Sequence, residues 1–286
     1  MQVFETVAGL RTYLRSIRAE GKKIGFVPTM GFLHKGHVAL MRDARDDGAD
    51  CVVVSIFVNP LQFGLREDYR DYPRDLDRDK ELCIQAGVDA LFVPAVEEMY
   101  PEGFATHVDV TGVTEILCGR SRPGHFRGVA TVVAKLFNIV QPDYAYFGIK
   151  DAQQVVVIQR MVQDLNFPLE VKIHPTVRED DGLAVSSRNI YLSAEERKAA
   201  TVLYRSLKLA QEAAEKGERD AARLKKLLAD KISAEPLARL DYAEIVSWPG
   251  LRAVERIGPG QTLFAVAAFF GRARLIDNIV VSTEVG

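Results

Sequence analysis

The chain has few cysteines, and their spacing excludes two classes of protein. Only three of the 286 residues are cysteine, namely Cys51, Cys83 and Cys118, and no two of them form a CxxC pair. Neither a disulfide framework nor a cysteine-based zinc site is therefore expected. Cys51 and Cys83 lie in apolar segments, so we expect buried thiols, whereas Cys118 lies near a loop and is expected to be more exposed.

Long hydrophobic runs and an excess of one charge are also missing. No run approaches the roughly 18 apolar residues of a membrane-spanning helix, and residues 1–21 lack the apolar core of a signal peptide. The formal net charge is −2, which gives no electrostatic reason to expect nucleic acid or a membrane as a partner. With 48% hydrophobic residues the chain can bury a sizeable core, and we expect a cytoplasmic protein.

Strand-like and helix-like segments alternate through the first two thirds of the chain. Apolar, partly β-branched runs predict strands at residues 23–29, 50–58, 89–94, 144–148 and 169–175. Helical patterns separate them, starting near residue 36 and recurring at 74–87, 127–142 and 151–165. This alternation predicts an α/β fold whose N-terminal domain, residues 1–176, is a Rossmann-like, doubly wound parallel sheet.

The pattern changes after residue 176. Residues 193–232 are rich in Ala, Leu, Lys and Glu and predict two amphipathic helices joined near Gly217. Strand-like runs follow at 241–247, 261–271 and 274–281. Helices followed by consecutive strands predict a smaller C-terminal α+β domain over residues 177–286.

Two histidines stand three residues apart in the segment PTMGFLHKGH, between a strand and a helix. Loops at the carboxyl ends of parallel strands bind ligands, and a helix N-terminus attracts phosphate. His34 and His37 are expected to face the same side of the first helical turn, and Gly31 and Gly36 to let a nucleotide approach the backbone. The residues alone leave open that the pair is only a capping or surface feature. No carboxylate has a fixed spacing to the pair, which disfavours a metal site, and a GxxxxGK(S/T) phosphate loop is missing.

Other polar segments carry candidate functional groups, and each has a structural alternative. Lys150 lies at a strand end, where Asp151 is also suited to cap the next helix. Asn59 and Gln62 follow the most apolar strand and need hydrogen-bond partners, which a turn of their own backbone would also supply. The segment DGLAVSSRN offers two hydroxyls and an arginine, or simply a serine N-cap with a solvated arginine. The acidic run DYPRDLDRD is by default a solvated face.

Longer blocks resemble a known family. HKGH resembles the HxGH signature of a nucleotidyltransferase superfamily. The blocks PTMGFLHKGH, VSIFVNPLQFG, DYPRDLDRD, RPGHFRGVATVVAKLFNIVQPDYAYFGIKDAQQ, PTVREDDGLAVSSRNIYLS and RLIDN follow one another as in the pantoate–β-alanine ligases. The resemblance implies that pantoate attacks the α-phosphorus of ATP to give pantoyl adenylate and pyrophosphate, and that β-alanine then releases AMP and forms pantothenate. It also implies Mg²⁺ with ATP, a homodimer, and a C-terminal domain that closes over the ATP site.

The resemblance further assigns roles to residues. It makes His34, His37 and Lys150 catalytic, and it implies Gln62, Gln154 and Asn59 for pantoate and β-alanine. Asp79 matches an acid that places Mg²⁺. The ATP-binding residues that it implies are Met30, Gly31, Phe32, Leu33, His34, Lys35, Gly36, His37, Gly148, Ile149, Lys150, Asp151, Val177, Val185, Ser186, Ser187 and Arg188. Ile149 departs from the family, whose members often have Glu or Gln there, and Val185 replaces a usual Leu or Met.

Two other functions compete with this hypothesis. A nucleotidyltransferase with a different acceptor would keep HxGH but would not need Gln62, Gln154 or the block FVNPLQFG. A regulatory ATP-binding module without turnover would be expected to lose His37, Lys150 or the SSR segment. All of these residues are present, which favours the ligase.

Overall fold

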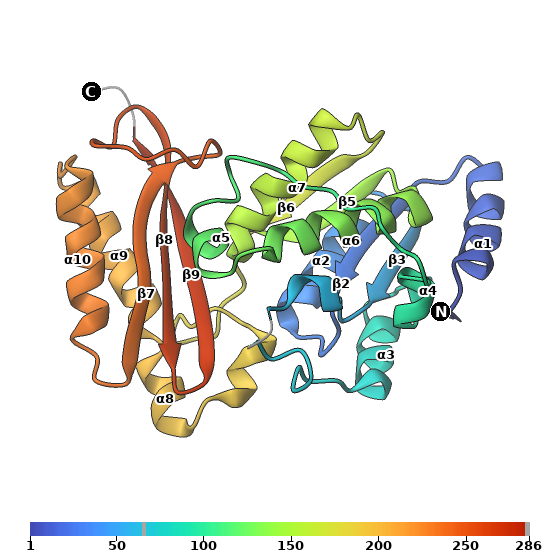
Figure 1. The fold of residues 1–286 in the computed structure, drawn as a ribbon, viewed down its shortest axis with the longest axis horizontal. Coiled ribbons are helices and arrows are strands. Elements are labelled where there is room, and N and C mark those ends of the chain that lie inside the picture. Colours follow the sequence, from blue (N-terminus) through green and yellow to red (C-terminus); the bar gives the residue numbers. More distant parts are fainter. Residues whose placement is uncertain (65–66, 284–286) are drawn as a thin grey trace. The chain divides into compact units, whose positions relative to one another are not determined.

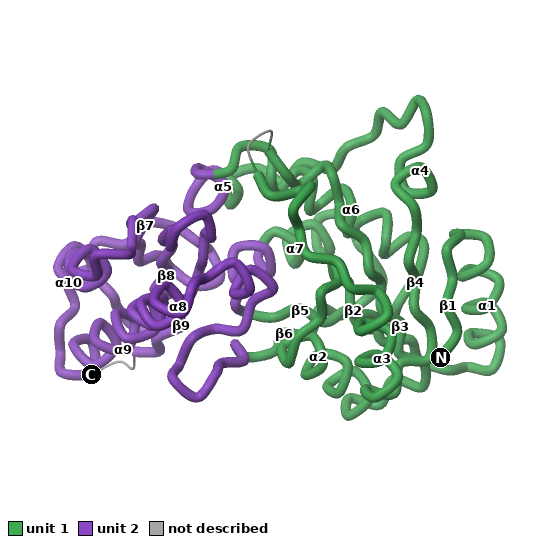
Figure 2. The backbone as a smooth tube through the Cα atoms, turned by 90° about the horizontal axis from the view of Figure 1, so that it is seen from below, with its two compact units in different colours: residues 1–114, 122–149, 157–175 green, residues 115–121, 150–156, 176–286 purple. Residues whose placement is uncertain are grey.

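The chain forms two compact units. The computed structural model describes residues 1–64 and 67–283, and Figure 1 labels their helices and strands. Unit 1 comprises residues 1–114, 122–149 and 157–175, and unit 2 comprises residues 115–121, 150–156 and 176–286 (Figure 2). The sequence suggested one boundary after residue 176. In the structure two short segments, 115–121 and 150–156, also group with unit 2, because their contacts are with residues distant in sequence.

Unit 1 is built on a six-stranded parallel sheet. The strands lie in the order β1-β4-β3-β2-β5-β6, with the bounds β1 Gln2–Phe4, β2 Ile24–Thr29, β3 Cys51–Ile56, β4 Ala90–Phe92, β5 Tyr144–Gly148 and β6 Glu170–His174. The chain leaves β2 toward β3 on one side and leaves β5 toward β6 on the other. Neighbours β2 and β5 therefore form the topological switch point, where open parallel sheets bind their ligands. The Rossmann-like sheet predicted from the alternating pattern is confirmed.

Helices cover both faces of this sheet (Figure 1). They are α1 Val7–Ala19, α2 Lys35–Asp46, α3 Leu76–Gln85, α4 Val96–Met99, α6 His125–Val140 and α7 Ala152–Asp164, whose first residues belong to unit 2. Met41 of α2 and Cys83 of α3 pack with Val27 in one buried cluster. On the other face Phe26 meets Phe137 of α6, with ring centroids 6.5 Å apart. Within the described residues no helix combines the length and hydropathy needed to span a membrane.

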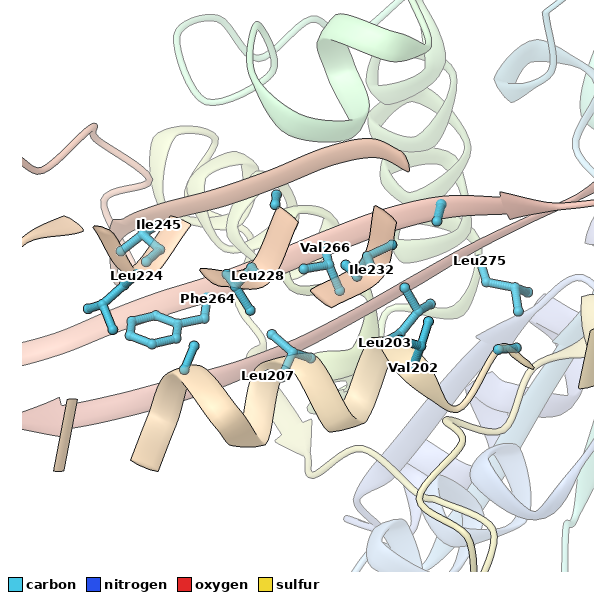
Figure 3. Packing of buried hydrophobic residues seen from close by; sticks show 14 of the residues in the cluster. Val202, Leu203, Leu207, Leu224, Leu228, Ile232, Ile245, Phe264, Val266 and Leu275 are labelled. Carbon is cyan, nitrogen blue, oxygen red and sulfur yellow. The ribbon is translucent and has the colours of Figure 1, made fainter. Parts of the chain in front are cut away.

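Unit 2 contains a three-stranded antiparallel sheet and its own core. The strands are β7 Ala238–Ser247, β8 Gly260–Phe270 and β9 Ala273–Thr283, and the helices are α5 Leu117–Ser121, α8 Ala194–Ala199, α9 Val202–Glu215 and α10 Ala221–Ser233. Figure 3 shows the buried side chains of α9 and α10, such as Leu207 and Leu228, packed against Phe264 and Val266 of β8. The smaller α+β domain expected from the sequence is confirmed.

One helix expected from the sequence is divided. Residues 193–215 form α8 and α9 instead of a single helix. The Thr201 hydroxyl donates to the Lys198 carbonyl at 2.8 Å, and such a side-chain bond competes with the main-chain ladder of a helix. No glycine or proline marks this position, so the periodic pattern did not reveal the break.

The cysteines are all buried thiols. This confirms the expectation for Cys51 and Cys83. Cys118 is 7% accessible, against 1% and 0% for Cys51 and Cys83, so it is the more exposed of the three but is buried as well. Its Sγ lies 3.3 Å from the Tyr242 hydroxyl and 3.6 Å from the guanidinium of Arg274, two residues of the C-terminal strands that local sequence could not reveal as neighbours.

Candidate active site

The segment after β2 forms a tight turn that leads into α2. Gly31 and Phe32 both have left-handed backbone, with φ of 81° and 48°. This conformation costs a residue with a side chain roughly 1–2 kcal/mol. A Cβ added at Gly31 would lie 2.9 Å from Cγ2 of Ile56, so only glycine fits there. The surrounding structure therefore holds this turn in a conformation that the chain would not adopt by itself.

Asp79 of α3 holds the turn. Its Oδ2 accepts the N–H of Phe32 and its Oδ1 accepts the N–H of Leu33, both at 2.7 Å, and the residue is only 1% exposed. Burial raises the pKa of this carboxyl, and the two N–H donors oppose the rise. Among the described residues there is no group of three or more His, Cys, Asp or Glu side chains placed to hold a metal. With each oxygen accepting a main-chain N–H group, Asp79 positions the loop, and its expected part in placing Mg²⁺ remains a prediction.

His34 and His37 meet at the start of α2, as expected from their spacing. Nδ1 of His34 accepts the N–H of Gly36 at 3.2 Å, and Nδ1 of His37 accepts the N–H of His34 at 3.3 Å. The rings stack with centroids 4.0 Å apart, whereas Lys35 between them is exposed. Because Nδ1 of each ring is an acceptor, the proton of each neutral ring lies on Nε2. The pair thus caps the helix with one edge and carries N–H donors on the other.

Asn59 orients Gln62 beyond the end of β3, at the short helix η1 (Pro60–Gln62). Nδ2 of Asn59 donates to Oε1 of Gln62 at 3.0 Å and to the carbonyl of Gly128 at 3.1 Å. Its Oδ1 accepts from the Tyr100 hydroxyl at 2.8 Å and from the N–H of Leu61 at 3.2 Å. An amide side chain has two donor and two acceptor positions, and all four are used inside the protein. Asn59, expected to contact substrate, is in this geometry a residue that positions Gln62.

Gln62 consequently directs its amide NH₂ toward Met30. The side chain is buried, its oxygen accepts from Asn59, and its Nε2 lies 2.9 Å from the sulfur of Met30. A thioether is a weak acceptor. A hydroxyl or carboxylate oxygen of a ligand would be a stronger one, so Gln62 is set up as a hydrogen-bond donor.

Three side chains without an assigned role in the sequence fasten the main chain of Gln62. His125 Nδ1 donates to the Gln62 carbonyl at 2.8 Å, Arg122 Nη1 donates to His125 Nε2 at 3.0 Å, and Arg122 Nε donates to Glu67 at 2.8 Å. Because a guanidinium only donates and a carbonyl only accepts, His125 is neutral with its proton on Nδ1. Burial opposes ionisation of Glu67, but its hydrogen bonds from Arg122 leave the pKa below the usual value. No local pattern marks such a network.

In unit 2 the segment expected to hold the triphosphate folds back on itself. The N–H of Val185 donates to the carbonyl of Val177 at 3.0 Å. Ser186 caps the short helix η3 (Ser187–Tyr191), accepting the N–H of Arg188 at 3.3 Å. The serine N-cap considered for this segment is therefore present.

The remaining expected residues lie around the junction of β5 and α7. Gly148 ends β5, and the short helix η2 (Ile149–Asp151) connects it to α7. Asp151 is exposed, whereas Gln154 is half-buried on the first turn of α7. In unit 2 the carbonyl of Lys150 accepts Nδ2 of Asn278 at 2.8 Å. The loops after β2 and β5 thus leave the two strands at the switch point of the sheet, which defines an α/β protein of the class that binds its ligand there.

Comparisons with known proteins identify the family. The family model for pantoate–β-alanine ligase matches residues 2–280. The pantothenate synthetase of Pelotomaculum thermopropionicum is 59% identical over 98% of this chain and 99% of its own. The crystal structure of pantothenate synthetase from Thermus thermophilus superimposes with a TM-score of 0.94 at 53% identity, covering 99% of this chain and 100% of its own. The crystal structure of the Francisella tularensis ligase, complexed with β,γ-ATP and β-alanine, superimposes with a TM-score of 0.80 at 33% identity. The match covers 98% of this chain and 97% of the Francisella chain.

The chain therefore belongs to the pantoate–β-alanine ligase family. It is a ligase, and the reaction of its family joins pantoate to β-alanine at the expense of ATP. Neither competing function, a transferase with another acceptor or a module without turnover, agrees with this membership.

Proposed function

We propose that this chain forms pantothenate in two steps, with pantoyl adenylate between them. In the first step a carboxylate oxygen of pantoate attacks the α-phosphorus of ATP, and the bond to the β-phosphate breaks to release pyrophosphate. In the second step the amine of β-alanine attacks the acyl carbon, AMP leaves, and the nitrogen loses a proton. The observation that carries this proposal is the histidine pair at the start of α2, whose Nδ1 atoms cap the helix and whose Nε2 atoms carry the protons.

The phosphate-binding groups act on the first step. Adenylyl transfer spreads negative charge over phosphoryl oxygens, and fixed donors and cations lower its barrier. His34, His37 and Lys150 supply such groups, and the N-terminus of α2 adds unpaired N–H groups and the positive end of its dipole. The further residues that we assign to ATP are Met30–Gly36, Gly148, Ile149, Asp151, Val177, Val185, Ser186, Ser187 and Arg188.

Magnesium is proposed to enter with the phosphates of ATP. Mg²⁺ usually keeps several waters and binds through substrate phosphates plus one or two carboxylates. Asp79 fits poorly as a ligand, because the residue is only 1% exposed and each of its oxygens already accepts one main-chain N–H group. We therefore assign the ion no ligand in this chain. The homodimer that the family resemblance implies and the cytoplasmic location that the sequence suggested remain predictions.

Pantoate is proposed to bind through two amides, Gln62 and Gln154. Each can donate to a hydroxyl or carboxylate oxygen of this substrate. The orientation that Asn59 gives to Gln62 supports the role of donor. A site of this kind rejects analogues that lack the hydroxyls, because its buried polar groups would then stay unpaired.

Removing either amide should weaken pantoate binding and spare ATP. We expect Gln62→Ala and Gln154→Ala each to cost about 1–3 kcal/mol of pantoate affinity, the penalty for an unpaired buried group. Calorimetric titration with each ligand measures both effects. Gln153→Ala is the matched control, because the Gln153 side chain is bonded instead to the main chain of Cys118 and Ile116. Equal losses for ATP and pantoate, or an equal loss of pantoate affinity in Gln153→Ala, would overturn the assignment.

A further inference from the structure

Two neighbouring residues of the RLIDN segment are buried although they are polar. Asp277 and Asn278 follow one another on β9 and are 2% and 6% exposed. Successive side chains of a strand point to opposite faces, so the two reach different partners. Burial of an acid and an amide is unfavourable unless both are hydrogen-bonded, and their partners lie in the two segments of unit 2 assigned above to the triphosphate.

Asp277 fastens the segment 177–188. Its Oδ2 accepts Nη1 of Arg178 at 2.7 Å and its Oδ1 accepts Nη2 at 2.8 Å, a bidentate pair. The same Nη1 donates to the carbonyl of Gly182 at 3.0 Å, and the guanidinium lies 3.9 Å from the ring centroid of Tyr204. Arg178 lies near the start of the segment and Gly182 in its turn. The ion pair with Asp277 holds the Arg178 guanidinium, which in turn holds the Gly182 carbonyl.

Asn278 fastens the main chain of Lys150, the cationic residue that we assign to the phosphates of ATP. Its Nδ2 donates to the carbonyl of Lys150 at 2.8 Å, and its own N–H donates to Oδ1 of Asp277 at 2.8 Å. Burial raises the pKa of Asp277, whereas Arg178 and, more weakly, Lys150 favour its ionised form. The Lys150 main chain and the segment 177–188 are therefore tied to consecutive residues of a single strand.

We propose that Asp277 and Asn278 are positioning residues for adenylate formation, which hold Lys150 and the segment 177–188 in a fixed register along β9. This inference rests on the proposed phosphate roles of Lys150 and of Ser186–Arg188. A buried ion pair is weak evidence for a gain in stability, since apolar residues of similar volume often serve as well. A bidentate pair and a directed amide bond do, however, fix geometry. A misplacement of about 1 Å of a phosphate-binding group can cost about 10²-fold in rate.

The proposal predicts a defect confined to the first step. Pyrophosphate has left when the amine attacks, so the second step depends less on where Lys150 and the segment 177–188 lie. We expect Asn278→Ala and Asp277→Asn to slow adenylate formation by roughly 10–100-fold and to raise the KM for ATP. Attack of β-alanine on supplied pantoyl adenylate should change by no more than about threefold. Asn278→Gln, which keeps an amide donor on a longer arm, should recover part of the loss.

The test is single-turnover kinetics of each step, with a melting curve for every variant. Leu228→Ala is the matched control, because it removes a core side chain of α10 and should lower the melting temperature while both steps persist. Should Asp277→Asn fail to fold, Asn278→Ala and Asn278→Gln carry the test. Equal losses in both steps that follow the melting temperature, or an unchanged first step, would overturn the proposal.

Lys150→Ala distinguishes a failure of this inference from a failure of the proposed function. If Lys150→Ala leaves adenylate formation intact, the phosphate role of Lys150 fails, and this inference fails with it. If Lys150→Ala is inactive and Asn278→Ala is not, only the inference fails.

Discussion

Replacing His37 with alanine is expected to slow adenylate formation by about 10²–10³-fold, the usual loss for one fixed electrostatic donor. The stabilised charge develops only in the transition state, so the loss should fall on kcat more than on ATP binding. Lys150→Ala should cost at least as much, because it removes a full charge. Attack of β-alanine should suffer less, since pyrophosphate has already departed. Single-turnover kinetics of the two steps measures these effects.

The capping role of His37 requires a control. Because Nδ1 of His37 accepts the N–H of His34, alanine also removes half of a capping box and should cost about 0.5–2 kcal/mol of stability. His37→Gln retains an acceptor at this position without the imidazole Nε2–H. We expect it to restore the melting temperature and not the rate. If His37→Ala loses both steps equally and melts far lower, and His37→Gln restores both steps together with the melting temperature, the histidine is structural.

Replacing Asp79 with alanine is expected to slow adenylate formation by roughly 10²-fold, although Asp79 is assigned no contact with substrate. The change leaves the N–H groups of Phe32 and Leu33 without their acceptor, and Phe32 has a left-handed conformation that needs support. The histidines two and five residues beyond Phe32 then move, and a shift of about 1 Å suffices for such a loss. A cavity of about 290 Å³ borders Asp79 and leaves room for water. Folding should therefore lose less than the full 1–3 kcal/mol per unpaired N–H.

Magnesium titration separates the positioning role of Asp79 from the metal-binding role that the family resemblance implies. If Asp79 holds the loop, raising Mg²⁺ should leave the slow step of Asp79→Ala unchanged. If it binds the ion, excess Mg²⁺ should recover much of the rate by mass action. Asp79→Asn should be intermediate, because one amide oxygen can still accept one N–H while its NH₂ faces the other. Wild-type protein over the same Mg²⁺ range is the control.

The order of the main strands and helices could be predicted from the sequence, because each element carries its own pattern. Buried parallel strands such as β3 are continuous apolar runs, and α6 is apolar and ends before Pro142. The elements β1 and α1 were not predicted. β1 has three residues, too few for any periodicity, and it is a strand only through its pairing with β4.

The candidate site could be located from the sequence, but the task of each side chain could not. The spacing of His34 and His37 predicted that their rings share one side, and the stacked rings confirm it. The sequence did not show that all hydrogen-bonding positions of the Asn59 side chain are occupied within the protein. Two of the partners of Asn59, Tyr100 and Gly128, lie 41 and 69 residues away along the chain. Asp79 stood in a run of acids that resembles a solvated face, and only the packing of α3 against the turn gives it a buried role.

Activation of pantoate as an adenylate is tested most directly by following its oxygen. Purified protein is incubated with ATP, Mg²⁺, β-alanine and pantoate that carries ¹⁸O at both carboxylate positions. The masses of the products are then measured by mass spectrometry. The oxygen that attacks the α-phosphorus stays on that phosphorus when the amine displaces AMP. Each AMP should therefore carry one ¹⁸O, and each pantothenate should retain the other. Unlabelled AMP, or ADP with ¹⁸O in inorganic phosphate, would contradict the adenylate route.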